Sequence, residues 1–136
     1  MKKIVCLLLV VVLVCSLTLP AAAAVIEPVE PCYKKIRSIA IGFDIDESTG
    51  IASCYARCIA WSNVTIKITG TLQQYSNGSW VYVTSWTKSG KDMVVLDEQW
   101  AVYRGYKYRF IATFSIYDSN GSFVESDSMS RIYDYT

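Results

Sequence analysis

Apolar and polar residues alternate along most of this chain with a period of two, the pattern of strands that bury one face. The alternation is clearest at residues 106–116, where aromatic and aliphatic side chains take every second position. It recurs at residues 39–45, 51–61 and 64–72. Residues 80–87, 91–100 and 121–133 are further strand candidates. The pattern predicts seven strands and no helix.

Turn signals support this division of the chain. Asn77-Gly78 and Asn120-Gly121 separate consecutive strand candidates, and Asn-Gly is a strong signal of a tight hairpin. Seven short strands rich in Val, Ile, Thr, Tyr and Trp indicate a single antiparallel β-sandwich of immunoglobulin-like type over residues 36–136.

The segment 51–61 predicts a feature of the core. Small side chains occupy one of its faces: Ala52, Cys54, Ala56, Cys58 and Ala60. A layer of small side chains needs bulky ones opposite, and we expect residues 106–116 to supply them.

The first 24 residues have the features of a secretory signal peptide. Lys2 and Lys3 precede an apolar run at residues 4–19, and small residues follow at 22–24. The run is shorter than the roughly 20 residues that span a bilayer, so we expect cleavage, membrane contact only through the uncleaved signal, and a product that is secreted or loosely held at the cell envelope. Residues 25–35, with Pro28 and Pro31, predict an extended linker or edge segment.

Removal of residues 1–24 leaves 112 residues, the size of one domain, with 11 basic and 12 acidic side chains. A nucleic-acid-binding protein needs a basic stripe to displace counterions. The near-neutral balance therefore argues against a nucleic-acid partner.

Five short segments, taken in order, resemble those of a family of small exported proteins of Gram-positive bacteria, a domain of unknown function. They are residues 50–54 (GIASC), 72–73 (LQ), 77–80 (NGSW), 85–86 (SW) and 105–109 (GYKYR). The resemblance covers about residues 36–117 and implies export and an immunoglobulin-like sandwich. It carries over no catalytic or binding residue, and Cys32 and Cys58 are additions to the family pattern.

Catalytic chemistry has little support. The chain has no histidine, so a serine or cysteine nucleophile lacks its usual base and a zinc site lacks its usual nitrogen ligands. The carboxylates of Asp44, Asp46 and Glu47 fall together in a predicted turn, where solvated acids are ordinary. We expect no enzyme activity and no cofactor.

The same turn copies the start of a calcium-binding loop, with oxygen ligands at Asp44, Asp46 and Ser48. The glycine required at the sixth position is Thr49, however, and the acid required at the twelfth is Tyr55. A hairpin turn without metal is the better interpretation.

Three cysteines follow the signal segment. Cys54 and Cys58 lie roughly 13 Å apart on one strand face, too far to bridge, so any internal disulfide must use Cys32. The candidate pair is Cys32 with Cys58. Cys54 is expected to act as a small core side chain.

An aromatic row is the main candidate for ligand contact. Trp80, Tyr82 and Trp86 would share one face of a regular strand, and Tyr75 lies across the hairpin from them. Exposed on a flat sheet, they could stack on sugars or anchor a protein partner.

The hairpin register decides whether the row is exposed. If Asn77-Gly78 is a two-residue loop, Leu72 pairs with Val83 and the aromatic residues face outward. If residues 76–78 form the loop, pairing slips by one residue and the aromatic residues enter the core. A bulge could satisfy both faces.

Tyr106 and Tyr108 follow Gly105 and resemble the tyrosine corner of sandwich proteins, a structural feature. Taken together, the sequence favours a secreted, non-catalytic binding or adhesion module that meets an unknown protein or glycan at the cell surface. A protein is preferred, because the aromatic row lacks acids and amides to bind sugar hydroxyls. The alternatives are a passive structural envelope protein and a carbohydrate-binding module.

Overall fold

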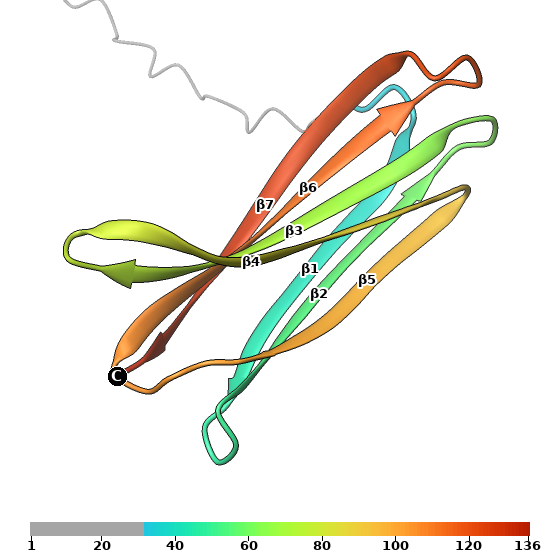
Figure 1. Ribbon diagram of the computed structural model, residues 1–136. Helices are drawn as coiled ribbons and strands as arrows, with labels where there is room; N and C mark the ends of the chain where they lie inside the picture. The colour runs from blue at the N-terminus through green and yellow to red at the C-terminus, as the bar shows by residue number, and fades with distance from the viewer. Residues whose placement is uncertain (1–31) are drawn as a thin grey trace, which may run out of the picture. The chain divides into compact units, whose positions relative to one another are not determined.

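The computed structural model describes residues 32–136; the predicted signal peptide and most of the predicted linker lie outside them. All seven predicted strands are present (Figure 1). They are β1 (Ile36–Asp46), β2 (Ile51–Ala60), β3 (Thr65–Ser76), β4 (Ser79–Gly90), β5 (Met93–Ala101), β6 (Tyr106–Tyr117) and β7 (Phe123–Tyr135). The described residues contain no helix of the length and apolarity needed to cross a bilayer.

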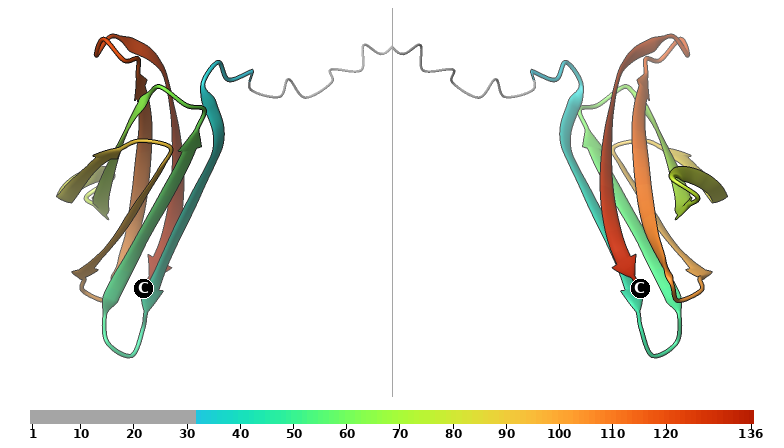
Figure 2. Two further views of the ribbon diagram at one scale, coloured as in Figure 1. Left: turned by 90° about the vertical axis from the view of Figure 1, so that its right-hand side faces the viewer. Right: turned by 90° about the vertical axis from the view of Figure 1, so that its left-hand side faces the viewer.

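The strands form two packed antiparallel sheets, so the protein is a β-sandwich. One sheet has the order β1-β2-β5 and the other has the order β4-β3-β6-β7. Figure 2 shows the two layers from the side. Three of the six connections join hairpin partners, β1-β2, β3-β4 and β6-β7. The other three cross between the sheets, from β2 to β3, from β4 to β5 and from β5 to β6.

The core contains the complementary layers that the sequence predicts. The small residues of β2 are fully or almost fully buried, and Phe110 and Phe114 of β6 are completely buried in the facing sheet. Gly70 of β3 belongs to the same arrangement, because a Cβ atom there would lie 2.8 Å from the ring of Phe110. The glycine therefore leaves room for an aromatic ring at the centre of the sandwich.

A side chain of β7 fixes the segment that leads into β1. Glu125 Oε1 accepts hydrogen bonds from the backbone N–H groups of Lys35 (2.6 Å) and Ile36 (2.7 Å), and Oε2 accepts one from Lys34 (2.8 Å). Tyr33 donates its hydroxyl to Asp127, and that hydrogen bond raises the pKa of Tyr33 to about 12. These bonds tie the edges of the two sheets together where β1 approaches β7.

The hairpin of β3 and β4 extends beyond the rest of the sandwich, as the yellow-green tip shows in Figures 1 and 2. At its tip, Asn77, Gly78 and Ser79 are all exposed. Even on the side that faces the other sheet, Val81 is 49% exposed. Both faces of this hairpin end are therefore open to solvent.

Candidate functional site

The turn between β3 and β4 settles the register of the hairpin. Asn77 and Gly78 both have positive φ angles, 51° and 82°, as a two-residue type I′ turn requires. Ser76 pairs with Ser79, and Tyr75 pairs with Trp80. The two-residue alternative is thus confirmed, the three-residue loop is wrong, and Tyr75 and Trp80 lie on the outer face.

A β-bulge then divides the predicted aromatic row. Gln73 pairs with Tyr82, but Leu72 pairs with Thr84, so Val83 is the extra residue. One extra residue reverses the alternation beyond it. The expectations that Leu72 pairs with Val83 and that Trp86 shares a face with Trp80 are therefore wrong.

Trp86 lies on the inner face, opposite Gly70. It is partly buried against the core and meets Trp100 of β5 in an edge-to-face contact, with ring centroids 6.2 Å apart. This pair packs across the edges of the two sheets. Trp86 is consequently part of the packing and does not belong to the outer surface.

Four residues on the outer face form what we call the aromatic-arginine cluster: Tyr75, Trp80, Tyr82 and Arg109. The ring centroids of Tyr75 and Trp80 are 5.1 Å apart at 60°, and Arg109 Cζ lies 4.4 Å from the Trp80 ring centroid. Tyr82 is 62% exposed and Tyr75 is 41% exposed. The two tyrosines therefore offer open apolar surface beside Trp80, which is partly buried.

Gln73 fixes the guanidinium of Arg109. Its Oε1 accepts hydrogen bonds from Nε (3.0 Å) and from Nη2 (2.6 Å) of Arg109. Gln73 and Arg109 are direct partners in the pairing of β3 with β6, which places both on the outer face. The guanidinium is thus held over the indole by one hydrogen-bond acceptor and one aromatic ring.

The geometry limits what the cluster can bind. Stacking of a sugar ring needs an open aromatic face, whereas Arg109 covers one face of Trp80 and Tyr75 meets the indole in an edge-to-face contact. The accessible groups are the tyrosine rings and the guanidinium edge. This combination suits a partner that brings both apolar and polar groups.

The tyrosine corner is formed by Tyr108 alone. Its side chain is 1% exposed, its hydroxyl donates to the carbonyl oxygen of Tyr103 (2.9 Å), and the N–H of Tyr103 donates back to it (3.1 Å). Burial raises the pKa of Tyr108. Tyr106 is 38% exposed and packs edge to face on Tyr108 with ring centroids 6.5 Å apart.

The cysteines occupy two environments. Cys54 and Cys58 are completely buried in the core, and burial raises their pKa values to about 12 and about 11. Cys32 is exposed, and all three are free thiols in the structure. The predicted core position of Cys54 agrees with this placement, while the candidate disulfide between Cys32 and Cys58 stays a prediction.

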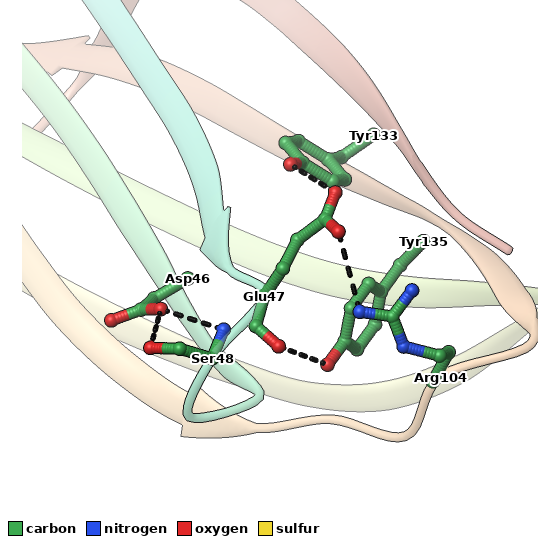
Figure 3. Close-up of polar contacts among 6 residues, drawn as sticks. All are labelled: Asp46, Glu47, Ser48, Arg104, Tyr133 and Tyr135. Atoms are coloured by element: carbon green, nitrogen blue, oxygen red, sulfur yellow. Dashed lines mark hydrogen bonds and ion pairs between the residues drawn. The ribbon is translucent and has the colours of Figure 1, made fainter.

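The acidic turn between β1 and β2 has a structural role (Figure 3). Asp46 Oδ1 accepts hydrogen bonds from the backbone N–H (2.9 Å) and the hydroxyl (2.6 Å) of Ser48. Glu47 accepts from the hydroxyl of Tyr133 (3.1 Å) and pairs with Arg104 (3.3 Å). Across residues 32–136, no three His, Cys, Asp or Glu side chains are arranged to hold a metal ion.

Two residues of the site were missed by reasoning from sequence: Arg109 and Gln73. Both occupy polar positions on predicted strands, where a solvated side chain is the ordinary expectation. Their contact depends on the pairing of β3 with β6, strands that are separated in the chain by β4 and β5. Counting outward positions from the Asn77-Gly78 turn would have identified Gln73, but no local signal indicates Arg109.

Comparison with known protein families finds no match to the chain, and comparison with curated protein sequences finds no significant similarity. The structure therefore assigns an architecture, a seven-stranded antiparallel sandwich of two sheets, and no family.

Proposed function

We propose that the protein is an exported, non-catalytic binding module that meets a partner at or outside the cell envelope through the aromatic-arginine cluster. The observation that carries this proposal is the exposed outer face of the projecting β3–β4 hairpin, on which Tyr82 is 62% and Tyr75 is 41% exposed. Apolar rings gathered on one exposed face are typical of an interaction site. Export rests on the signal-like features of residues 1–24.

An immunoglobulin-like assignment of the sandwich belongs to the same proposal. In an immunoglobulin constant domain, the first, second, fifth and fourth strands form one sheet. Here the first, second and fifth strands form one sheet, while the fourth pairs with the third in the other. This order and the corner made by Tyr108 support an immunoglobulin-like variant in which the fourth strand has changed sheets. The resemblance to small exported Gram-positive proteins is compatible with it.

Hairpins and loops at the end of such a rigid sandwich are common positions for binding surfaces. The carbohydrate alternative is weaker, because Arg109 covers one face of the Trp80 ring. A passive structural protein would make no site-specific contact through this face.

Site-specific photocrosslinking distinguishes these functions. A photoreactive phenylalanine analogue is placed at Tyr82, or at Thr87, which is exposed on the same strand and the same outer face. We expect a discrete adduct from position 82 in the producing cells that excess unlabelled protein abolishes, and none from position 87. Equal labelling from both positions, or none from either, would contradict a binding role for the cluster.

A further inference from the structure

We propose that the aromatic-arginine cluster recognises an acidic segment of a protein partner, with Arg109 as the anchor for a carboxylate. This inference rests on the proposed binding function and specifies the chemistry of the partner. It depends on the positioning of Arg109, on the charge of the surrounding strands and on the apolar side chains beside the guanidinium.

The guanidinium of Arg109 is held in place by Gln73, but most of its N–H donors remain without an acceptor. It carries five N–H donors, of which Nε–H and one on Nη2 are donated to Gln73. Among the described residues, Arg109 makes no other side-chain hydrogen bond and no ion pair. The remaining donors, including both on Nη1, are free for the planar two-point contact that arginine makes with a carboxylate.

The charge of Arg109 has no acidic partner within the described residues. Strands β3, β4 and β6 contain no Asp or Glu at all, whereas they carry Lys67, Lys88, Lys107 and Arg109. The nearby acid of β7, Asp134, pairs with Lys107 at 3.4 Å. Lys107 is thus paired, Lys67 lies six residues along β3 from Gln73, and Lys88 lies on the inner face of β4 opposite Ile68. Arg109 is therefore the unpaired cation of the cluster, and it is complementary to an anionic group.

Apolar side chains flank the guanidinium. Ile132 of β7 lies directly opposite Arg109 and is 60% exposed, and the cluster tyrosines lie toward the hairpin. Side chains of this kind exclude water when a partner covers them, which strengthens a charged hydrogen bond at the centre.

The composition of the cluster favours a protein over a glycan. Tryptophan, tyrosine and arginine are the residue types most enriched among the energetically dominant positions of protein interfaces. An acidic glycan would satisfy Arg109, but it would not use Ile132 and the tyrosine rings as a peptide with apolar side chains can. We therefore assign the cluster to a protein segment in which a carboxylate neighbours apolar side chains.

Selection from a random peptide library displayed on phage tests this assignment. The bait is protein expressed from the full chain, and bound phage are released by competition with excess free protein. We expect the selected peptides to contain Asp or Glu next to apolar residues and to bind less tightly at high salt, because screening weakens the ion pair. Arg109→Met should weaken binding roughly ten- to hundredfold, since a charge-assisted hydrogen bond of this kind is lost.

Arg57→Met provides the matched control. Arg57 is also partly buried on the outer face of its sheet, but on the three-stranded one, and its substitution should leave binding unchanged. Thermal denaturation of each variant establishes that it folds, and Arg109→Lys, which keeps the charge without the planar fork, should give an intermediate affinity.

The outcomes separate the two proposals. Peptides that lose affinity with Tyr82→Ala but lack acids, or that tolerate Arg109→Met, would overturn the carboxylate assignment and leave the binding function in place. Peptides indifferent to both Tyr82→Ala and Arg109→Met, or a selection without binders, would overturn both. Preferential binding of acidic glycans over the selected peptides on an array would replace the protein partner with a glycan.

Discussion

At the scale of single residues, one buried hydroxyl group ties down the middle of the connection between β5 and β6. Tyr108 buries its ring in the core and places its oxygen between the N–H and the carbonyl oxygen of Tyr103. Without that oxygen, two backbone groups of Tyr103 would lose their partner. The hydroxyl therefore adds to the backbone hydrogen bonds from Val102 to Gly50 and from Gly105 to Tyr135 that hold this connection.

Removal of this hydroxyl should destabilise the fold. For Tyr108→Phe we expect a loss of about 1–2 kcal/mol in the free energy of unfolding, the usual cost of breaking a buried hydrogen bond and leaving polar groups unpaired. Urea denaturation followed by fluorescence gives the value. Tyr106→Phe is the control, because the Tyr106 hydroxyl makes no hydrogen bond in the described structure, and it should have no measurable effect. Equal losses of unfolding free energy in the two variants would show that the Tyr108 hydroxyl does not stabilise this connection.

Two glycines test how tightly the sandwich is packed. A Cβ atom at Gly70 would lie 2.8 Å from Phe110 and 3.3 Å from Leu96, whereas one at Gly42 would meet Tyr55 at an ordinary 3.5 Å. Overpacking typically costs 1–3 kcal/mol, so Gly70→Ala should destabilise the fold by about that amount. Gly42→Ala should be neutral or slightly stabilising, because it restricts the unfolded chain. Differential scanning calorimetry of the two variants measures the contrast, and a stable Gly70→Ala protein would refute the close packing.

At the scale of elements, the alternation of residues predicts the strands but does not determine the pairing register of the β3–β4 hairpin. Asn77-Gly78 favours a two-residue turn because both residues accept positive φ, and the structure contains that turn. The bulge at Val83 has no comparable local signal. It allows Tyr82 to face outward while Trp86 packs on Trp100, a contact between different sheets that a single strand's pattern cannot reveal.

The segment leading into β1 should respond to acid through Glu125. Burial opposes ionisation of this carboxyl, but three backbone N–H donors and nearby Lys34 outweigh it and lower its pKa. A lowered pKa in the folded state stabilises the protein above the unfolded-state pKa, and this contribution is lost as pH falls through the folded value. Glu125→Gln should therefore cost about 1–2 kcal/mol at neutral pH and progressively less in acid.

Urea denaturation at a series of pH values measures this dependence. Glu98→Gln serves as the control, since Glu98 makes no side-chain hydrogen bond or ion pair in the described structure. It should leave the difference between neutral and acidic pH unchanged. A Glu125→Gln penalty that stays constant down to low pH would show that the charge of Glu125 does not hold the segment.

At the scale of the whole molecule, the sandwich architecture is predictable from the sequence, but only some residues of the candidate site are. Each strand with alternating residues must bury one face, so the strands must pack as two layers. The small side chains on the buried face of β2 require bulky side chains opposite, and β6 supplies them. Tyr75, Trp80 and Tyr82 were predicted as candidates from their pattern. Arg109 and Gln73 were not, because their contact arises only when β3 and β6 pair.

The burial of the core also predicts the reactivity of the thiols. Cys54 and Cys58 are inaccessible and have raised pKa values, whereas Cys32 is exposed. In native protein without residues 1–24, we expect iodoacetamide at neutral pH to modify Cys32 alone, and all three cysteines in denaturant. Peptide mapping by mass spectrometry locates the label. An unreactive Cys32 whose reactivity a reductant restores, together with a peptide in the map that joins it to Cys58, would instead indicate the disulfide with Cys58.

The proposed binding face requires Trp80 to lie on the outer face beside Tyr75 and Arg109, and solution NMR spectroscopy can locate the indole. With Arg109 Cζ 4.4 Å from the Trp80 ring centroid, ring currents should shift the Arg109 side-chain protons upfield. Nuclear Overhauser effects should connect the indole to Arg109 and Tyr75. Effects that connect the indole to the core methyl groups of Leu72 and Leu96 would place Trp80 inside the sandwich, where it could not form part of a binding face.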